Sequence, residues 1–355
     1  MAPLMSLYDL AKPFLFLFSA EKAHGLAILA LKSGLLPSAT RSPSDILSQY
    51  LWGLEFPNPV GLAAGFDKNA EVYAPMLKQG FGFVETGTVT PLAQSGNEKP
   101  RIFRLTEDRA VINRLGFNNK GLEYYVRQLS ARRAEGGIVG ANIGANKLSE
   151  DQIEDYVIGL KRVLPLADYF TINISSPNTP GLRALQGREA LDELLSKLKA
   201  VRDEAKLEKK PPLLLKIAPD LDDSECEDIA EIILKHEMDG LIVSNTTLSR
   251  NGLTSSLNKE SGGLSGEPLF VLSTDVLSKM YSLTGGKIPL VGVGGVSNGK
   301  QAYEKIKAGA SLVQLYSALV YRGPGLARTI NSELEILIKK DGFSNITEAI
   351  GINHQ

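Results

Sequence analysis

The sequence predicts an α/β protein: a (β/α)8 TIM barrel with a short N-terminal helical hairpin. Eight short apolar runs alternate with stretches of helical periodicity, a pattern typical of parallel strands covered by helices. Glycine-rich turns follow the seventh and eighth runs as well as the first, which favours a barrel over an open doubly wound sheet. The 355 residues suit a barrel of roughly 250 residues plus an appendage.

The appendage is predicted to be a hairpin of two helices over residues 1–38, ahead of a catalytic barrel over residues 39–355. Ser19 can cap the second helix, and Gly34 and Pro37 can end it. Charged residues interrupt both apolar runs, so neither reaches the roughly 18–20 apolar residues that a membrane span needs. Two alternatives remain open from the residues alone: the hairpin packs on the barrel, or it dips into a bilayer surface and admits an apolar molecule.

The barrel strands are short apolar runs bounded by glycine, proline or polar residues. They are expected at residues 59–64, 82–88, 137–142, 169–174, 213–217, 240–245, 288–294 and 311–316. Helical spacing of apolar residues predicts helices at about residues 70–79, 119–135, 149–164, 187–209, 223–237, 268–283, 298–308 and 324–340. A short strand is expected near residues 51–56, and residues 89–117 form a long insert. Pro289 is a mild objection to the seventh strand, tolerable near a strand start.

Charge and cysteine content exclude several classes of function. A net charge of −1 provides no basic field to attract nucleic acid. The single cysteine, Cys226, cannot form an intrachain disulfide or a cysteine-based metal cluster. Its acidic neighbours oppose ionisation of the thiol, so a nucleophilic role is not expected. The three histidines lack metal-ligand spacing, and no metal is expected.

Small polar groups gather where the fourth strand ends. Asn173, Ser176 and Asn178 offer a hydroxyl and two amides there, and Pro177 and Pro180 restrict the loop. Chemistry in a barrel sits at the carboxyl ends of the strands. Taken alone, the stretch could equally be an ordinary turn, but similar groups at the other strand ends favour a site.

Two lysines also stand at strand ends. Lys216 ends an apolar strand, and Lys68 follows the first strand beside Asp67. Buried lysines are uncommon unless they are paired or functional. One such lysine could bind the edge of a flavin ring and the other a substrate carboxylate. For Lys68 the alternative is an ion pair with Asp67.

Glycines after the seventh strand predict a phosphate site. The run from Val291 to Gly295 leads into a helix, so backbone amides can approach a phosphate near a helix N-terminus. Ser265-Gly266 and Tyr316-Ser317 could add donors. A set of asparagines at strand ends and in the insert would make a neutral lattice suited to a planar, amide-rich ligand such as a pyrimidine. The set is Asn113, Asn142, Asn173, Asn178 and Asn245.

With these residues assembled, the chain resembles class 2 dihydroorotate dehydrogenase, the quinone-dependent enzyme of pyrimidine biosynthesis. The resemblance runs from Ala23 to Gly351. Its motifs are GLAAGFDKNAE, FGFVETGTVTP, GNEKPRIFRL, INRLGFNN, NISSPNTPGLR, LLLKIAPDL, SNTTLSR, GGLSG, VGVGGV and GASLVQLYSAL. It implies oxidation of (S)-dihydroorotate to orotate, with FMN as hydride acceptor and a membrane quinone as final acceptor.

Matching positions imply roles for individual residues. Those implied for FMN are Ala63, Ala64, Gly65, Phe66, Asp67, Thr88, Asn142, Asn173, Lys216, Ser244, Gly266, Gly295, Tyr316 and Ser317. Those implied for dihydroorotate are Lys68, Asn113, Arg114, Leu115, Gly116, Phe117, Asn173, Asn178, Asn245 and Thr246. Those implied for a quinone tunnel are His24, Arg104 and Tyr316. Ser176 matches the catalytic base, and its proton is expected to leave through a path that includes Thr179 or Thr246.

The resemblance leaves alternatives for class and location. A soluble class 1 type enzyme using fumarate or NAD would carry cysteine where this chain has Ser176. A phosphate-binding isomerase or lyase and a membrane-associated scaffold are the further alternatives. The absence of an Arg-rich transit segment favours a peripheral protein on the cytoplasmic face of the bacterial inner membrane. The mitochondrial inner membrane is the alternative.

Overall fold

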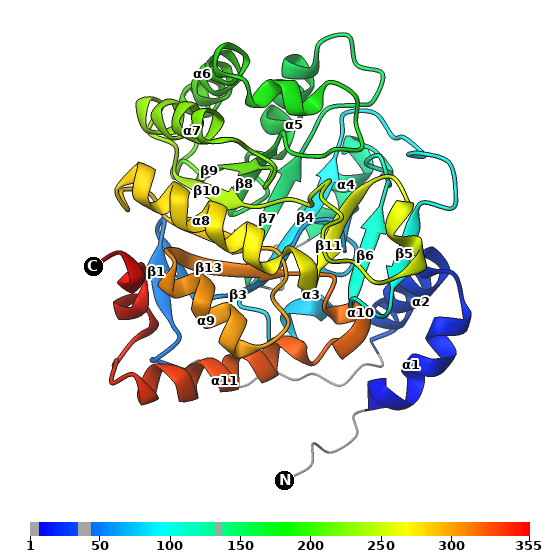
Figure 1. Cartoon of the computed structure of the whole chain (residues 1–355). Helices are drawn as coiled ribbons and strands as arrows, with labels where there is room; N and C mark the ends of the chain where they lie inside the picture. Colours follow the sequence, from blue (N-terminus) through cyan, green and yellow to red (C-terminus); the bar gives the residue numbers. More distant parts are fainter. Residues whose placement is uncertain (1–6, 35–43, 132–135) are drawn as a thin grey trace.

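Eight parallel strands close into a barrel, as predicted (Figure 1). The computed structural model describes residues 7–34, 44–131 and 136–355. The barrel strands are β3 (Val60–Leu62), β4 (Phe83–Val89), β7 (Ile138–Ile143), β8 (Tyr169–Asn173), β9 (Leu213–Ile217), β10 (Gly240–Val243), β12 (Leu290–Val293) and β13 (Ala310–Leu315). Each strand pairs with the next of this series, and β13 pairs with β3 to close the ring. β12 begins directly after Pro289, so the proline does not interrupt the ladder.

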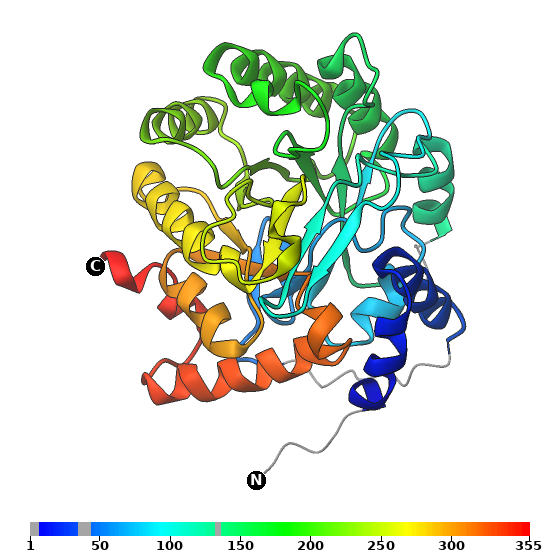
Figure 2. The ribbon, with the colours of Figure 1, turned by 45° about the vertical axis from the view of Figure 1, so that its right-hand side comes forward.

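Helices surround the barrel (Figure 2). They are α3 (Tyr73–Leu77), α4 (Leu122–Ser130), α5 (Gln152–Val163), α6 (Arg188–Glu204), α7 (Asp223–Lys235), α8 (Phe270–Thr284), α9 (Gly299–Lys307) and α11 (Leu326–Lys340), with the short α10 (Leu319–Arg322) after β13. The helix expected at 70–79 is only five residues long, because Ala70 and Val72 have non-helical φ values of 57° and −140°. The helix expected from residue 119 begins at Leu122, after Gly121 with φ 81°.

A hairpin, rather than the single expected strand at 51–56, closes the N-terminal end of the barrel. It consists of β1 (Gln49–Leu51) and β2 (Leu54–Phe56), which are antiparallel. Phe56, Phe83 and Tyr169 pack together with side chains from the strand starts. A Cβ on Gly61 would meet the Phe83 ring at 2.2 Å, so glycine there makes room for the ring. Aromatic packing at this end leaves the opposite mouth for polar groups.

The insert after β4 contributes two strands of its own. β5 (Ile102–Leu105) and β6 (Ala110–Asn113) form an antiparallel sheet with β11 (Gly263–Gly266), which belongs to the loop after β10. In this sheet Asn113 is the register partner of Gly263. The two long loops are thereby joined to each other, and each carries residues implied for ligand binding.

The N-terminal hairpin forms as α1 (Leu7–Leu17) and α2 (Ala20–Lys32). Ser19 caps α2 as predicted, accepting a hydrogen bond from the Lys22 N–H, whereas Pro37 lies outside the described residues. Figure 1 places both helices beside β5 and α10, and α2 is tied to the barrel by Glu21–Arg101 and Lys32–Glu71 ion pairs, both 2.7 Å. Among the described helices, none combines the length and apolar character needed to cross a bilayer. The two ion pairs hold α2 of the hairpin against the barrel.

Candidate active site

One continuous cavity of about 2130 Å³ joins the mouth of the barrel to the N-terminal hairpin. Its walls come from the carboxyl ends of barrel strands, from the insert, from the β11 loop and from α1 and α2. At the barrel end the lining is polar and includes Ser176 and Lys216, and at the other end it includes Leu15, Phe16 and Ala27 of the hairpin. The cavity therefore connects a polar chamber with an apolar passage.

Four of the five predicted asparagines line the cavity, and the fifth, Asn142, lies behind them. The Asn173 amide donates to Thr88 Oγ1 at 2.9 Å and to Asn142 Oδ1 at 3.2 Å. The Asn245 amide donates to Asn173 Oδ1 at 3.3 Å, and the Asn178 amide donates to Asn113 Oδ1 at 3.3 Å. The asparagines therefore form two hydrogen-bonded groups, Asn142–Asn173–Asn245 at the strand ends and Asn113–Asn178 between the insert and the loop after β8.

Beneath these asparagines lies a carboxylate that the sequence interpretation missed. Glu85 is fully buried and accepts hydrogen bonds from Asn142 Nδ2 at 2.7 Å, Gln314 Nε2 at 2.8 Å and the Tyr169 hydroxyl at 3.2 Å. An acidic residue in an apolar strand is the same kind of signal that identified Lys216, and it would have found Glu85.

Lys216 is buried without a direct partner. Its side chain is about 5% exposed, and its ammonium has neither a hydrogen bond nor an ion pair within the described parts of the chain. Burial lowers the pKa of Lys216, and the charge of Glu85 opposes that effect. Since the side chain lines the cavity, the free donor is available to a ligand.

Lys68 and Asp67 do not pair with each other. The Asp67 carboxylate accepts the backbone N–H groups of Glu71 and Val72, both at 2.7 Å, and so shapes the turn that precedes α3. The Lys68 ammonium donates to the Gly65 carbonyl at 2.6 Å. Burial lowers the pKa of Lys68 to about 8. Lys68 lines the cavity, which leaves its charge available for an anionic ligand.

Ser176 is buried and lines the polar chamber. Its Oγ accepts a hydrogen bond from the Asn178 N–H at 3.3 Å, and no described residue accepts the hydroxyl proton. The Thr179 hydroxyl is also buried and has no partner within the described protein. Neither Thr179 nor Thr246 contacts Ser176 by a direct hydrogen bond, so the expected proton path stays a prediction that would require bridging water.

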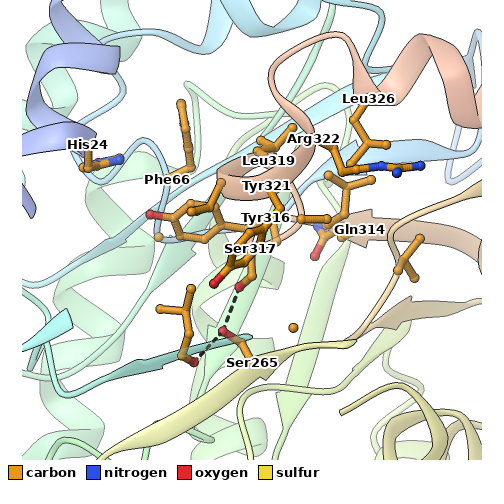
Figure 3. Close-up of a pocket in the computed structure, with 18 of the residues that line it drawn as sticks. His24, Phe66, Ser265, Gln314, Tyr316, Ser317, Leu319, Tyr321, Arg322 and Leu326 are labelled. Atoms are coloured by element: carbon orange, nitrogen blue, oxygen red, sulfur yellow. Dashed lines mark hydrogen bonds between the residues drawn. The ribbon is translucent and has the colours of Figure 1, made fainter. Parts of the chain in front are cut away.

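The turn after β12 can accept a phosphate. Gly294 and Gly295 have φ values of 113° and 75°, and a Cβ on Gly295 would meet the Phe270 backbone at 2.5 Å, so only glycine fits. Both glycines line the cavity. Ser265 and Ser317 line the same cavity, and their hydroxyls are 2.7 Å apart (Figure 3). Backbone N–H groups and hydroxyls together make an anion-binding wall.

Aromatic rings line the cavity where the polar chamber meets the hairpin. His24 of α2 packs edge-on against Phe66 at a centroid distance of 5.2 Å, and Phe66 packs against Tyr316 at 5.5 Å (Figure 3). Burial lowers the pKa of His24 to about 3, so its imidazole is neutral at physiological pH. Arg104 donates to the Phe16 carbonyl at 3.2 Å and the Phe18 carbonyl at 2.5 Å, which fixes the end of α1.

Most residues implied by the resemblance line this one cavity, and three do not: Asp67, Asn142 and Arg114. Asp67 holds a backbone turn, and Asn142 lies behind Thr88 and Asn173. Arg114 pairs with Glu260 at 2.7 Å. These three side chains support the walls of the cavity.

Cys226 is buried, and burial raises the pKa of its thiol. Within the described ranges, no cluster of histidine, cysteine or acidic residues could hold a metal ion.

A polar chamber at the carboxyl ends of barrel strands, with two lysines and a glycine turn, is the arrangement of a (β/α)8-barrel enzyme. The family model described as dihydroorotate dehydrogenase matches residues 46–338. The protein named dihydroorotate dehydrogenase (quinone) of Azorhizobium caulinodans is 54% identical over 353 residues, covering 98% of this chain and 99% of that protein. The protein of the same name from Brucella melitensis biotype 2 is 57% identical over 343 residues, covering 96% of this chain and 94% of that protein.

A solved structure agrees with these relatives. The dihydroorotate dehydrogenase of Eimeria tenella, crystallised in complex with ferulenol, superposes with a TM-score of 0.91 at 42% identity, covering 94% of this chain and 96% of that one. The chain belongs to the dihydroorotate dehydrogenase family, within its quinone-dependent class.

Proposed function

We propose that this protein oxidises (S)-dihydroorotate to orotate in pyrimidine biosynthesis, with FMN as hydride acceptor and a membrane quinone as final electron acceptor. The observation that carries the proposal is the continuity of the cavity: it joins the chamber holding Ser176 and Lys68 to the apolar passage along α1 and α2. A single flavin between these two ends could exchange electrons with both substrates.

The residues of the chamber suit FMN. Lys216 offers a buried donor that has no partner among the described residues, of the kind that would stabilise negative charge at the edge of the isoalloxazine ring. Gly295, Ser265 and Ser317 offer backbone and hydroxyl donors for the phosphate. When bound, FMN supplies the acceptor for the hydride that leaves C6 of the substrate. Thr88, Asn173 and the residues from Ala63 to Phe66 would complete its binding site.

At the substrate end, we assign Ser176 as the base that takes the proton from C5. Loss of this proton and of the C6 hydride breaks two C–H bonds and forms the C5=C6 double bond of orotate. Lys68 would hold the substrate carboxylate, and the asparagine lattice would hydrogen-bond the ring amides. The walls from the insert would be Leu115, Gly116 and Phe117, with Asn113, Asn178, Asn245 and Thr246 as polar contacts.

At the hairpin end, we assign His24, Arg104 and Tyr316 to the border of a quinone passage. Large apolar side chains of the hairpin face outward: Leu10, Phe14 and Leu17 on α1, Phe18 in the connection, and Leu26 and Leu29 on α2 are all more than 40% exposed. Such a surface suits insertion into one leaflet of a bilayer. We therefore place the protein peripherally on the cytoplasmic face of a bacterial inner membrane, with residues 1–38 as the membrane-associating unit.

An anaerobic spectral titration tests the proposal. Purified protein should carry a flavin spectrum that bleaches on addition of dihydroorotate and returns on addition of a short-chain quinone, but not of fumarate or NAD. Reoxidation by fumarate or NAD would retain the barrel and the substrate but reject the quinone assignment. A colourless protein that dihydroorotate leaves unchanged would reject the proposal altogether.

A further inference from the structure

Lys305 is a buried lysine that the proposed reaction does not use. It lies on α9, and its side chain has no exposed surface. Its ammonium donates to Ser273 Oγ at 2.9 Å and Thr274 Oγ1 at 3.0 Å, and lies 5.2 Å from the centre of the Phe270 ring. All three contacts come from the first turns of α8.

Among the described residues, no carboxylate is in contact with this ammonium. Within the described residues Lys305 forms no ion pair, and the acidic group that acts on it from a distance is the exposed Asp275. Burial lowers the pKa of Lys305 to about 7. A buried ammonium held only by hydroxyls and an aromatic face is costly to the folded state, since neither replaces an anion. With this lowered pKa the amine is partly neutral near pH 7, and a negative group nearby would favour its charged form.

The contacts of Lys305 lead to the phosphate turn. Ser273 Oγ lies 3.1 Å from the Gly294 carbonyl, to which it can donate. A Cβ on Gly294 would meet Ser273 Oγ at 2.7 Å, and one on Gly295 would meet Phe270. The start of α8 is thus packed directly behind the turn. The chain of contacts runs from the Lys305 ammonium through the Ser273 hydroxyl to the backbone of Gly294.

We infer that Lys305 is a positioning residue for the phosphate group of the flavin: it holds the Gly294–Gly295 turn through Ser273 and supplies positive charge from behind that turn. The inference rests on the proposed binding of FMN. A phosphate at the turn provides a negative group of this kind, and the low dielectric of the packed α8–α9 interface preserves the attraction. The alternative is that Lys305 only fills space between the two helices.

The two roles differ in how they affect flavins with and without phosphate. Full-length protein is equilibrated with equimolar FMN and riboflavin, and the bound flavins are released by heat and separated by chromatography. In the Lys305→Met variant the bound ratio of FMN to riboflavin should fall by about tenfold or more, equivalent to roughly 1.4 kcal/mol. Lys305→Gln, which keeps a hydrogen-bond donor but lacks the charge, should lower the ratio similarly.

Lys307→Met is the matched control, because Lys307 lies two positions along the same helix and stacks on Tyr303 at 4.9 Å. It should leave the ratio within about twofold of the wild-type value. An unchanged ratio in Lys305→Met, or a loss of both flavins in equal proportion, would overturn the inference and leave a space-filling role. If the wild-type chain bound neither flavin, the proposed function itself would fail.

Discussion

Glu85 accepts a hydrogen bond from the Asn142 amide at 2.7 Å, so a fully buried carboxylate supports the polar chamber from below. Asn142 in turn accepts from Asn173, which lines the cavity. The carboxylate therefore determines the orientation of an amide that the ligand would meet.

Replacing Glu85 with glutamine should destabilise the protein. Asn142, Tyr169 and Gln314 all donate hydrogen bonds to Glu85. The NH2 group of a glutamine at this position would point at the NH2 group of Asn142 or of Gln314, and two donors cannot form a hydrogen bond with each other. We expect Glu85→Gln to lower the free energy of unfolding by about 1–3 kcal/mol, measured by urea denaturation. The exposed Glu55→Gln is the control and should change it by less than about 0.5 kcal/mol. Equal stability of the two variants would contradict the donor assignment.

Removing the Ser176 hydroxyl should slow flavin reduction without weakening product binding. General-base catalysis contributes about 100-fold or more, so Ser176→Ala should reduce the rate of flavin bleaching by dihydroorotate by at least that factor in stopped-flow experiments. The Kd of orotate, which has no proton at C5 to transfer to Ser176, should change by less than about threefold. A rate loss below about tenfold, or roughly 1.4 kcal/mol of barrier, would remove Ser176 from the role of base.

Orotate binding should weaken with rising pH. The pKa of Lys68 is lowered to about 8 in the unliganded protein, so its ammonium is charged below that pH and neutral above it. A bound carboxylate favours the charged form, and affinity should therefore be constant below about pH 7 and fall by up to tenfold per pH unit above about 8. Fluorescence titration measures the Kd. Lys68→Met should bind weakly at every pH, and a steep pH dependence in that variant would point to another group.

Substituting aspartate for exposed apolar residues on α1 should weaken the binding of the protein to membranes. Phe14 and Leu17 are 69% and 83% exposed, and burying each in lipid would contribute about 1.5–3 kcal/mol. We expect the double variant Phe14→Asp, Leu17→Asp to lose at least tenfold in vesicle co-sedimentation while dihydroorotate still bleaches its flavin. Leu148→Asp, at an equally exposed leucine outside the hairpin, should co-sediment as the wild type does. Undiminished binding of the double variant would contradict the role of α1.

The positions of the polar groups along the chain were predictable because each is a polar or charged residue within or directly after an apolar strand. Lys216 is a charge in an apolar strand, and the asparagines follow strand ends. Glu85 fits the same description, as a charge in the buried strand β4, but Thr86 and Thr88 make that strand less uniformly apolar than β9. Lys305 gave no such signal, since a lysine on an amphipathic helix is ordinarily exposed, and only the packing of α8 against α9 buries it.

Local periodicity in the sequence was sufficient to determine the barrel, its strand order along the chain and the hairpin, because apolar spacing and capping depend on near neighbours. Tertiary structure decided the rest. It joined the insert to the β11 loop, shortened α3 and separated Lys68 from Asp67. It also placed Glu85 below the asparagines and Lys305 behind the Gly294–Gly295 turn. Such relations depend on which distant strands and helices meet, and the free energy of burying a charge depends on everything packed around it.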